Sequence, residues 1–398
     1  MKNNFSQIED LEVFTREQLI NEVRAKFTLQ YGNEPENVTL IPGRINIIGE
    51  HTDYNDGLAM PAAINRWICG AISKSSKASS TIYSLNYNEN FEISHHTPDK
   101  IQKIWKQLTA TSIYVIKTEF GIEEGANLTV GGNIPIGCGL SSSSAFVIAI
   151  VQIFCRLFSI QMENRQLAAL CQKIENKVLG TAGGLLDQYG IILSKKNHFM
   201  VIDFQYDSIE YIPVSLNECS WVVVNSQVQR ELSESAYIQR VNECKEGLEI
   251  LKKECNISTF REIDQAMLQK LKTKHNVLYR RLCHVVDENQ RVKDMNDQLQ
   301  QGLVDKVGTI LRESHESLKS LYEVSCEEID YIVQLSEVFD GWYGGRIIGG
   351  GFGGCSIHLV ADHVLEDYHG NITTNYTKKY DIIPDIKKVT FPGGLQYL

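Results

Sequence analysis

The stretch GRINIIGEHTDYNDG, residues 43 to 57, combines a short apolar run with a high density of polar side chains. Ile47 and Ile48 favour a buried strand, which would not tolerate so many charges, whereas a fully solvated loop would not need the two isoleucines. The polar residues around them are Arg44, Glu50, His51, Asp53, Tyr54 and Asp56. The stretch therefore predicts a strand that continues directly into a polar binding loop.

The overall composition is that of a globular protein with a large core. The chain has 398 residues, of which 43% are hydrophobic and 22% charged. At about 150 residues per domain, this length predicts two or three domains. The net charge of −10 argues against non-specific binding to nucleic acid and against a basic membrane-binding face. It does not exclude an anionic substrate, because a phosphate group responds to local donors.

The cysteines and the apolar segments indicate a cytoplasmic protein. The ten cysteines are scattered without a C-x-x-C pair, which is typical of a reduced compartment. The first residues, MKNNFSQIED, contain no apolar stretch of the signal-peptide type. The most apolar segment, AFVIAIVQIFCRLF at 145–158, contains Gln152 and Arg156 and is too short to span a bilayer.

The periodic segments predict a fold of mixed strands and helices. Residues 37–49 favour two short strands around Pro42-Gly43, and Asn164 and Gly180 are expected to bound a helix. Further strands are expected within 57–74, 80–87, 126–133, 198–204, 220–226 and 346–360. Helices are expected over 10–32, 99–120, 144–158, 164–180, 232–254, 259–273, 279–300, 303–312 and 327–339. A domain boundary is placed near 212–220, around Pro213.

The loop PIGCGLSSSSA, residues 135–145, has the composition of a phosphate-binding loop. Gly137 and Gly139 remove side chains where a ligand must approach the backbone, and four serines lead into the apolar helix. A helix N-terminus offers unpaired N–H groups and a positive dipole end, which suit a phosphate. A serine-capped helix after a flexible turn is the alternative. The loop is not of the Walker A type, because no lysine follows the glycines.

Two further stretches contain glycines and candidate functional groups. In GTAGGLLDQYG, residues 180–190, Asp187 follows an apolar pair at the edge of a predicted core, although this stretch alone favours a turn or helix-capping aspartate over a functional one. In GGRIIGGGFGGC, residues 344–355, three glycines match G-x-G-x-x-G. A strand follows them instead of the helix that a dinucleotide site needs, so this interpretation is rejected. The turn could let a phosphate loop pack against it.

Taken in order, these stretches resemble the motifs of the GHMP small-molecule kinases, and most closely those of members that phosphorylate galactose. PGRINIIGEHTDYNDG is similar to the sugar-binding signature, PIGCGLSSSSA to the ATP-phosphate loop, GGLLDQ to the catalytic region and GGGFGGC to the third motif. A weaker likeness runs through residues 223–244. The resemblance implies an α+β fold of two domains, 1–215 and 216–398, with the active site between them. The first would be ribosomal-S5-domain-2-like and the second ferredoxin-like.

The resemblance also implies roles for individual residues. Arg44 and Asp187 would be catalytic, and Ser143 and Glu175 would hold Mg²⁺, which prefers hard oxygen ligands. The implied sugar-binding residues are Glu50, His51, Asp53, Gly184 and Tyr237. The implied ATP-binding residues are Gly137, Gly139, Ser141, Ser142, Ser143 and Ser144.

The implied activity is ATP-dependent phosphorylation of the C1 hydroxyl of galactose, with ATP and Mg²⁺ and without nucleic-acid or membrane partners. The expected assembly is a monomer or a weak oligomer. The sequence departs from the family pattern at Gly183, Leu186 and Ile348. Two alternatives therefore stay open: a kinase for another sugar, such as N-acetylgalactosamine or arabinose, and a sugar sensor without turnover.

Overall fold

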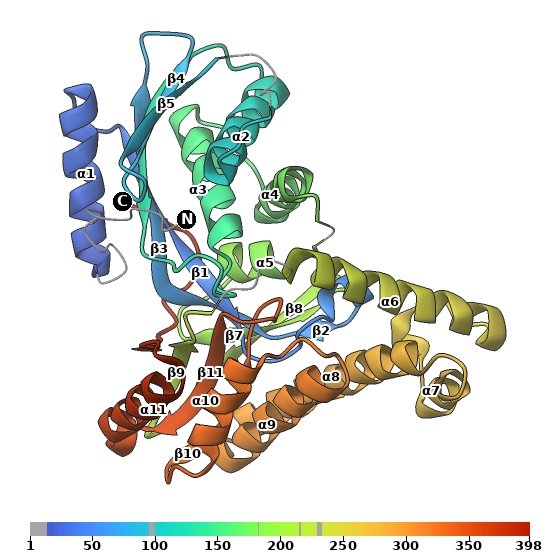
Figure 1. Cartoon of the computed structure of the whole chain (residues 1–398). Coiled ribbons are helices and arrows are strands. Elements are labelled where there is room, and N and C mark those ends of the chain that lie inside the picture. The colour runs from blue at the N-terminus through green and yellow to red at the C-terminus, as the bar shows by residue number, and fades with distance from the viewer. Residues whose placement is uncertain (1–13, 95–99, 182, 215, 229–232) are drawn as a thin grey trace.

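The computed structural model describes residues 14–94, 100–181, 183–214, 216–228 and 233–398. Figure 1 shows an upper half built on a six-stranded sheet and a lower half that contains a four-stranded sheet and most of the helices. The first sheet has the order β13-β1-β3-β6-β4-β5. Its strands are β1 (Asn37–Asn46), β3 (Pro61–Lys74), β4 (Ser80–Ser84), β5 (Glu89–Ile93), β6 (Ala126–Gly132) and β13 (Gln396–Tyr397).

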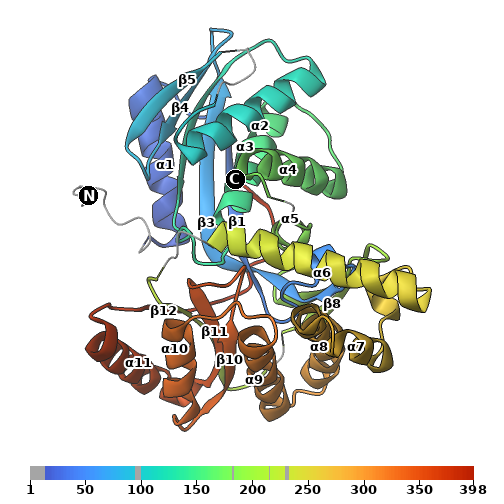
Figure 2. The ribbon, with the colours of Figure 1, turned by 45° about the vertical axis from the view of Figure 1, so that its right-hand side comes forward.

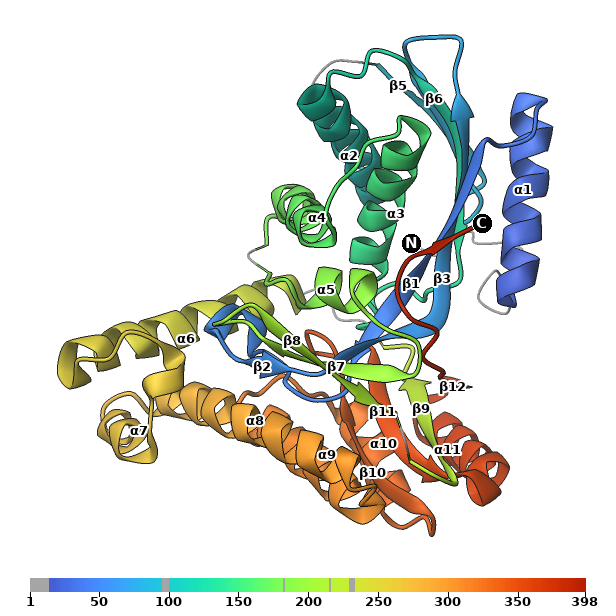
Figure 3. The same ribbon diagram turned by 180° about the vertical axis from the view of Figure 1, so that it is seen from behind.

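Helices cover both faces of the six-stranded sheet (Figures 1 and 3). Helix α1 (Arg16–Tyr31) packs on one face, and α2 (Ile104–Phe120), α3 (Ser142–Leu157) and α4 (Asn164–Leu179) lie on the other. The alternation of side chains along β3 explains this arrangement. Trp67 and Cys69 pack in the core cluster of α1, whereas Ile68 and Ile72 belong to the main core on the side of α3.

Strand β1 differs from its prediction and leads into the site. It is one ten-residue strand and not two short ones, and its pairing with β3 shifts register between Pro42 and Gly43. A bulge accommodates proline, which cannot donate to the ladder. Ile47 and Ile48 follow the strand and are fully buried, and the polar residues after them form a turn with a short helix, η2 (Asp53–Asn55). The predicted strand with a polar loop at its end is confirmed.

The lower half contains the remaining sheets and most of the remaining helices (Figure 2). The four-stranded sheet has the order β10-β11-β9-β12, and a three-stranded sheet has the order β2-β7-β8. These strands are β2 (Leu58–Ala59), β7 (His198–Asp203), β8 (Ser208–Pro213), β9 (Cys219–Asn225), β10 (Trp342–Ile347), β11 (Cys355–Ala361) and β12 (Asp385–Lys388). The helices are α6 (Ser233–Cys255), η3 (Phe260–Glu262), α7 (Gln265–Lys272), α8 (Asn276–Gln300), α9 (Val304–Ser320), α10 (Glu327–Glu337), η4 (Asp362–Val364) and α11 (Leu365–Tyr380). Helix α5 (Leu186–Ile192) packs instead on β1, β3, α3 and α4 of the upper half.

The two halves share one core. Val222 and Val224 of β9 pack in the cluster that includes side chains of α10 and α11, whereas Trp221 and Val223 belong to the same main core as the first sheet. The four-stranded sheet is therefore buried on both faces. The end of the chain also returns to the first sheet, because β13 pairs with β1 at Thr39 and Leu40.

Several predicted helix limits were wrong, for local reasons. Glu163 caps α4, and Asn164 is its first residue. The predicted helix 259–273 divides into η3 and α7, because the Asp264 carboxylate accepts a hydrogen bond from Met267 N and starts a new helix. Helix α9 continues to Ser320, past the predicted end at residue 312, because polar residues of its second half are buried. The predicted domain boundary falls at Ser215, which lies outside the described residues, and it stays a prediction.

A membrane-spanning helix is absent from the described residues, since none of their helices has both the length and the apolar composition that it requires.

Two helical glycines provide a test of the packing between α9 and β10. A Cβ atom at Gly308 of α9 would lie 2.2 Å from the Tyr343 carbonyl oxygen, whereas a Cβ at Gly370 of α11 meets nothing within 4 Å. We expect Gly308→Ala to lower the free energy of unfolding by about 1–3 kcal/mol. Gly370→Ala should raise it by about 0.5–1 kcal/mol. Urea unfolding followed by circular dichroism measures both, and equal effects would contradict the close approach of α9 to β10.

Candidate active site

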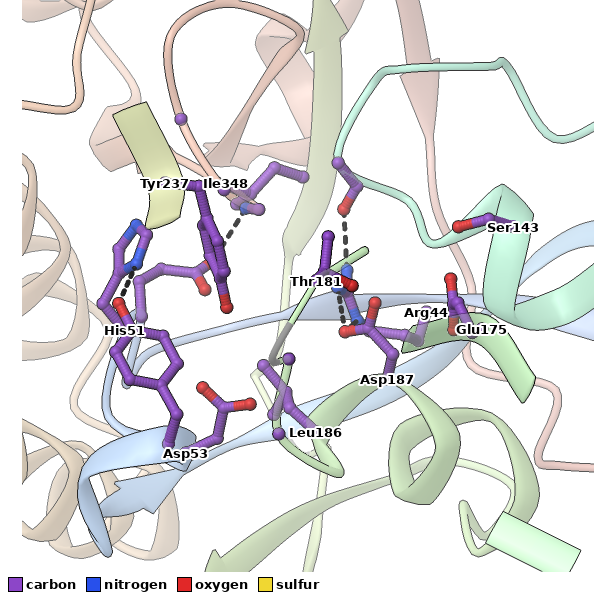
Figure 4. A pocket seen from close by; sticks show the side chains of 18 of the residues that line it. Arg44, His51, Asp53, Ser143, Glu175, Thr181, Leu186, Asp187, Tyr237 and Ile348 are labelled. Carbon is purple, nitrogen blue, oxygen red and sulfur yellow. Dashed lines mark hydrogen bonds and ion pairs between the residues drawn. The ribbon is translucent and has the colours of Figure 1, made fainter. Parts of the chain in front are cut away.

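Segments that lie far apart in the sequence meet at a cavity of about 380 Å³. Its walls come from the loop after β1, the glycine-serine loop before α3, the turn between α4 and α5, the start of α6, and the glycine turn between β10 and β11. Figure 4 shows the Arg44–Asp187 pair near the middle, with Ser143 and Glu175 on one side and Asp53, His51 and Tyr237 on the other. The cavity therefore has two ends of different chemistry, which the ion pair separates.

The buried Arg44 side chain joins three of these segments. Its Nε donates to Asp187 Oδ1 at 2.8 Å, and its second terminal nitrogen also contacts this oxygen. The other terminal nitrogen donates to the Gly139 carbonyl at 2.7 Å. Burial alone would lower the pKa of Arg44, but the carboxylates of Asp187, Glu50 and Asp53 outweigh burial and raise it. Arg44 is thus a fixed positive charge, and it leaves Asp187 Oδ2 free of arginine contacts.

The glycine-serine loop packs directly on the glycine turn. A Cβ at Gly139 would lie 2.9 Å from the Ile348 carbonyl oxygen, and a Cβ at Gly349 would lie 2.6 Å from the Gly139 Cα atom. Both glycines have positive φ angles, 71° and 76°. Strand β11 begins at Cys355, immediately after the turn, so a dinucleotide-binding helix is absent here and its rejection is confirmed.

The serines of the loop occupy different environments. Ser143 lines the cavity, whereas Ser141, Ser142 and Ser144 are not part of its walls. Ser144 is fully buried, and its hydroxyl lies 2.7 Å from Glu175 Oε2 and 3.3 Å from Asp187 Oδ2. It bridges two carboxylates below the cavity, a role that the sequence did not suggest, because four consecutive serines look equivalent before helix α3 fixes their directions.

Glu175 and Asp187 make the end of the cavity near Ser143 acidic. Glu175 is buried on α4 and accepts hydrogen bonds from Ser144 and from Gln188 Nε2, the latter at 2.8 Å. Burial and then the nearby Asp187 raise the pKa of Glu175. Two carboxylates and serine hydroxyls at one end of the cavity form a set of hard oxygen donors, and a divalent cation there would offset the repulsion between the carboxylates. No group of three or more His, Cys, Asp or Glu side chains suited to a metal occurs among the described residues.

The opposite end of the cavity is lined by polar side chains and tyrosines. Asp53 lies against Gly184, where a Cβ would come within 2.1 Å of the Asp53 carboxylate. Burial, and then the charge of Asp187, raise the pKa of Asp53 to about 7. The ring of Tyr237 packs 5.6 Å from the ring of His51. All of these residues line the cavity.

His51 and Glu50 are fixed in place by hydrogen bonds to other groups of the protein. His51 Nδ1 is 2.7 Å from the Tyr54 hydroxyl, its Nε2 is shielded from solvent, and burial lowers its pKa to about 3, so the ring is neutral. The Glu50 carboxylate accepts from Arg346 at 3.2 Å and from Gly349 N at 2.9 Å. The fully buried Arg346 also donates to the carbonyls of residues 46 and 47. Arg346 was not predicted to belong to the site, although an arginine at the start of a predicted strand is a usable signal.

Comparison with known proteins identifies the family. A model described as the galactokinase galactose-binding signature matches residues 25–74, and models of the GHMP kinase N-terminal and C-terminal domains match residues 103–195 and 295–368. Galactokinase from Staphylococcus carnosus is 31% identical over 96% of this chain and 100% of its own. Galactokinase from Thermotoga neapolitana is 35% identical over 89% of this chain and 98% of its own.

Comparison with solved structures supports the same family. Lactococcus lactis galactokinase complexed with galactose has a TM-score of 0.89 and 29% identity, with coverage of 95% of this chain and 99% of that one. Mevalonate kinase from Methanococcus jannaschii has a TM-score of 0.64 at 17% identity, with coverage of 89% and 98%, and shares the fold. The expected α+β fold of the GHMP kinases is thus confirmed, and the chain belongs to the galactokinases within the GHMP kinase family.

Proposed function

We propose that this protein transfers the γ-phosphoryl group of ATP to the C1 hydroxyl of galactose, which yields galactose 1-phosphate and ADP. The observation that carries the proposal is the ion pair of the buried Arg44 with the half-buried Asp187, placed between the galactose-binding signature and a glycine-serine loop at a helix N-terminus. The galactokinases among its relatives and the galactose complex of the Lactococcus enzyme support the choice of sugar.

Asp187 is the general base in this proposal. Arg44 binds Oδ1, so Oδ2 is available to accept the proton of the C1 hydroxyl. The resulting oxygen attacks the γ-phosphorus, a new P–O bond forms, and the bond to the β–γ bridging oxygen breaks as ADP leaves. Arg44 also stabilises the negative charge that spreads over the equatorial oxygens of the phosphoryl group.

The phosphate chain of ATP lies on the glycine-serine loop in this proposal. Gly137 and Gly139 line the cavity without side chains, and the N-terminus of α3 supplies free N–H groups and a positive dipole end. Ser141 and Ser142, which start the helix, take part through their backbone, whereas Ser144 positions the carboxylates of Glu175 and Asp187. ATP and sugar would thus meet at the Arg44–Asp187 pair.

Ser143 and Glu175 would hold Mg²⁺. Both line the cavity at its acidic end, and their oxygens suit this ion. Bound Mg²⁺ neutralises charge on the phosphates of ATP and orients them. The residues proposed to bind sugar are Glu50, Asp53, Gly184 and Tyr237, with His51 as their support. We further propose two domains, residues 1–215 and 216–398, in a cytoplasmic enzyme.

A coupled ADP-release assay over a panel of sugars tests the proposed function. We expect galactose to give the highest kcat/KM, with glucose about 10⁴-fold lower, because a site built to pair a hydroxyl rejects a sugar that leaves its groups unpaired. If N-acetylgalactosamine gave the higher kcat/KM, it would take the place of galactose as the proposed substrate. The room for its larger substituent would then be sought at Gly183, which has no side chain at the cavity wall. Binding of sugar and ATP without turnover on any sugar would identify a sensor.

Replacement of the proposed metal ligand separates metal binding from sugar binding. Glu175→Gln should raise the Mg²⁺ concentration for half-maximal rate by about tenfold or more, because a neutral amide is a weaker ligand than a carboxylate. Galactose binding measured by calorimetry without nucleotide should be retained. Glu119→Gln on the exposed face of α2 is the control. An unchanged Mg²⁺ titration in Glu175→Gln would remove Glu175 from the metal site.

A further inference from the structure

Three side chains of α8, His284, Glu288 and Asn289, bond to the backbone of the loop after β1, and we call them the α8 clamp. They are not among the residues that line the cavity. Resting on the proposed function, we propose that the α8 clamp consists of positioning residues that set the shape of the sugar-binding loop, and so determine sugar affinity without touching the sugar.

Glu288 forms the centre of the clamp. Its side chain is fully buried, and its Oε1 accepts from Gly49 N at 3.0 Å, from Glu50 N at 3.4 Å and from the Ser314 hydroxyl at 2.8 Å. Its Oε2 accepts from Arg291 Nε at 2.7 Å. Burial alone would raise the pKa of Glu288, but Arg291, His284 and Arg346 outweigh burial and lower it to about 2. A fixed negative charge therefore holds the first two amides of the loop.

His284 and Asn289 hold further backbone groups on either side of Glu288. His284 Nε2 lies 3.1 Å from the Glu50 carbonyl oxygen, which can only accept, so this nitrogen carries the hydrogen. Its Nδ1 then accepts from the Ser317 hydroxyl at 2.8 Å. Burial lowers the pKa of His284 to about 4, in agreement with a neutral ring. Asn289 Oδ1 accepts from Leu58 N at 2.7 Å and fixes the far end of the loop.

The backbone of the loop needs such external support. Gly49, His51 and Asp56 all have positive φ angles, of 93°, 62° and 53°. For a residue with a side chain this conformation costs about 1 kcal/mol or more, and it persists only where the surroundings enforce it. Gly57 leaves room for the clamp, because a Cβ there would lie 2.7 Å from Asn289 Oδ1.

The clamp acts on affinity and not on the chemical step. Glu50, His51 and Asp53 lie between its two points of attachment, at Gly49 and at Leu58. The Arg44–Asp187 pair is held instead by β1, α5 and the Gly139 carbonyl. A loosened loop must be ordered again when sugar binds, which weakens binding, while the reacting groups keep their positions.

Calorimetric titration with galactose, without nucleotide, is the direct test. Glu288→Gln removes the charge that holds Gly49 N and Glu50 N, and we expect galactose Kd to rise about tenfold. The KM for ATP and kcat should stay within about threefold of the original protein. Asp287→Asn on the same helix is the control, since its carboxylate bonds instead to Gln265, and it should leave Kd unchanged within about twofold.

Asn289→Ala is the second variant, because it removes an uncharged partner and leaves Leu58 N unpaired. We expect about a fivefold rise in galactose Kd, and this variant decides the matter if Glu288→Gln does not fold. The proposal is overturned if the folded variants bind galactose within twofold of the original protein, or if their affinities for ATP and galactose fall in parallel. If the protein prefers another sugar, the proposed function fails, and the same titrations with that sugar still test the clamp.

Discussion

The buried guanidinium of Arg44 is the contact on which the geometry of the cavity depends. It binds Asp187 from α5 and the Gly139 carbonyl from the glycine-serine loop, while its own backbone belongs to β1. Arg44 is buried whereas the Asp187 side chain is 31% exposed at the cavity wall, so loss of this carboxylate would leave a buried positive charge without its main partner. The same contact leaves one oxygen of Asp187 available, so the interaction that stabilises the site also prepares its proposed base.

A second buried arginine connects the two halves of the molecule. Arg346 of β10 binds the carbonyls at the end of β1 and the carboxylate of Glu50, which also accepts from Gly349 N. The glycine turn in turn packs on Gly139. Together, Arg346 and the α8 clamp fix the sugar-binding loop with side chains from the second half of the chain. The site therefore cannot form in either half alone.

Much of the fold around the site was predictable from the sequence, because the strand with its polar loop and the glycine-serine loop carry local signals. The sequence also indicated Asp187 and Arg44 through their motifs. Contacts that depend on the fold had no such signal. Ser144 looks identical to its neighbours until α3 turns its hydroxyl toward Glu175, and Glu288 looks like one more acidic residue of a polar helix. The polar second half of α9 suggested an earlier end, because its burial arises only from packing.

A double-mutant cycle on kcat tests the central claim, that Arg44 and Asp187 act as one unit. Arg44→Ala and Asp187→Asn should each lower kcat by about 10²-fold or more. If the two act together, the double variant should be no more than about threefold slower than the slower single variant, because the first change already disables the pair. Losses that multiply, to about 10⁴-fold for the double variant, would show independent roles and contradict the claim.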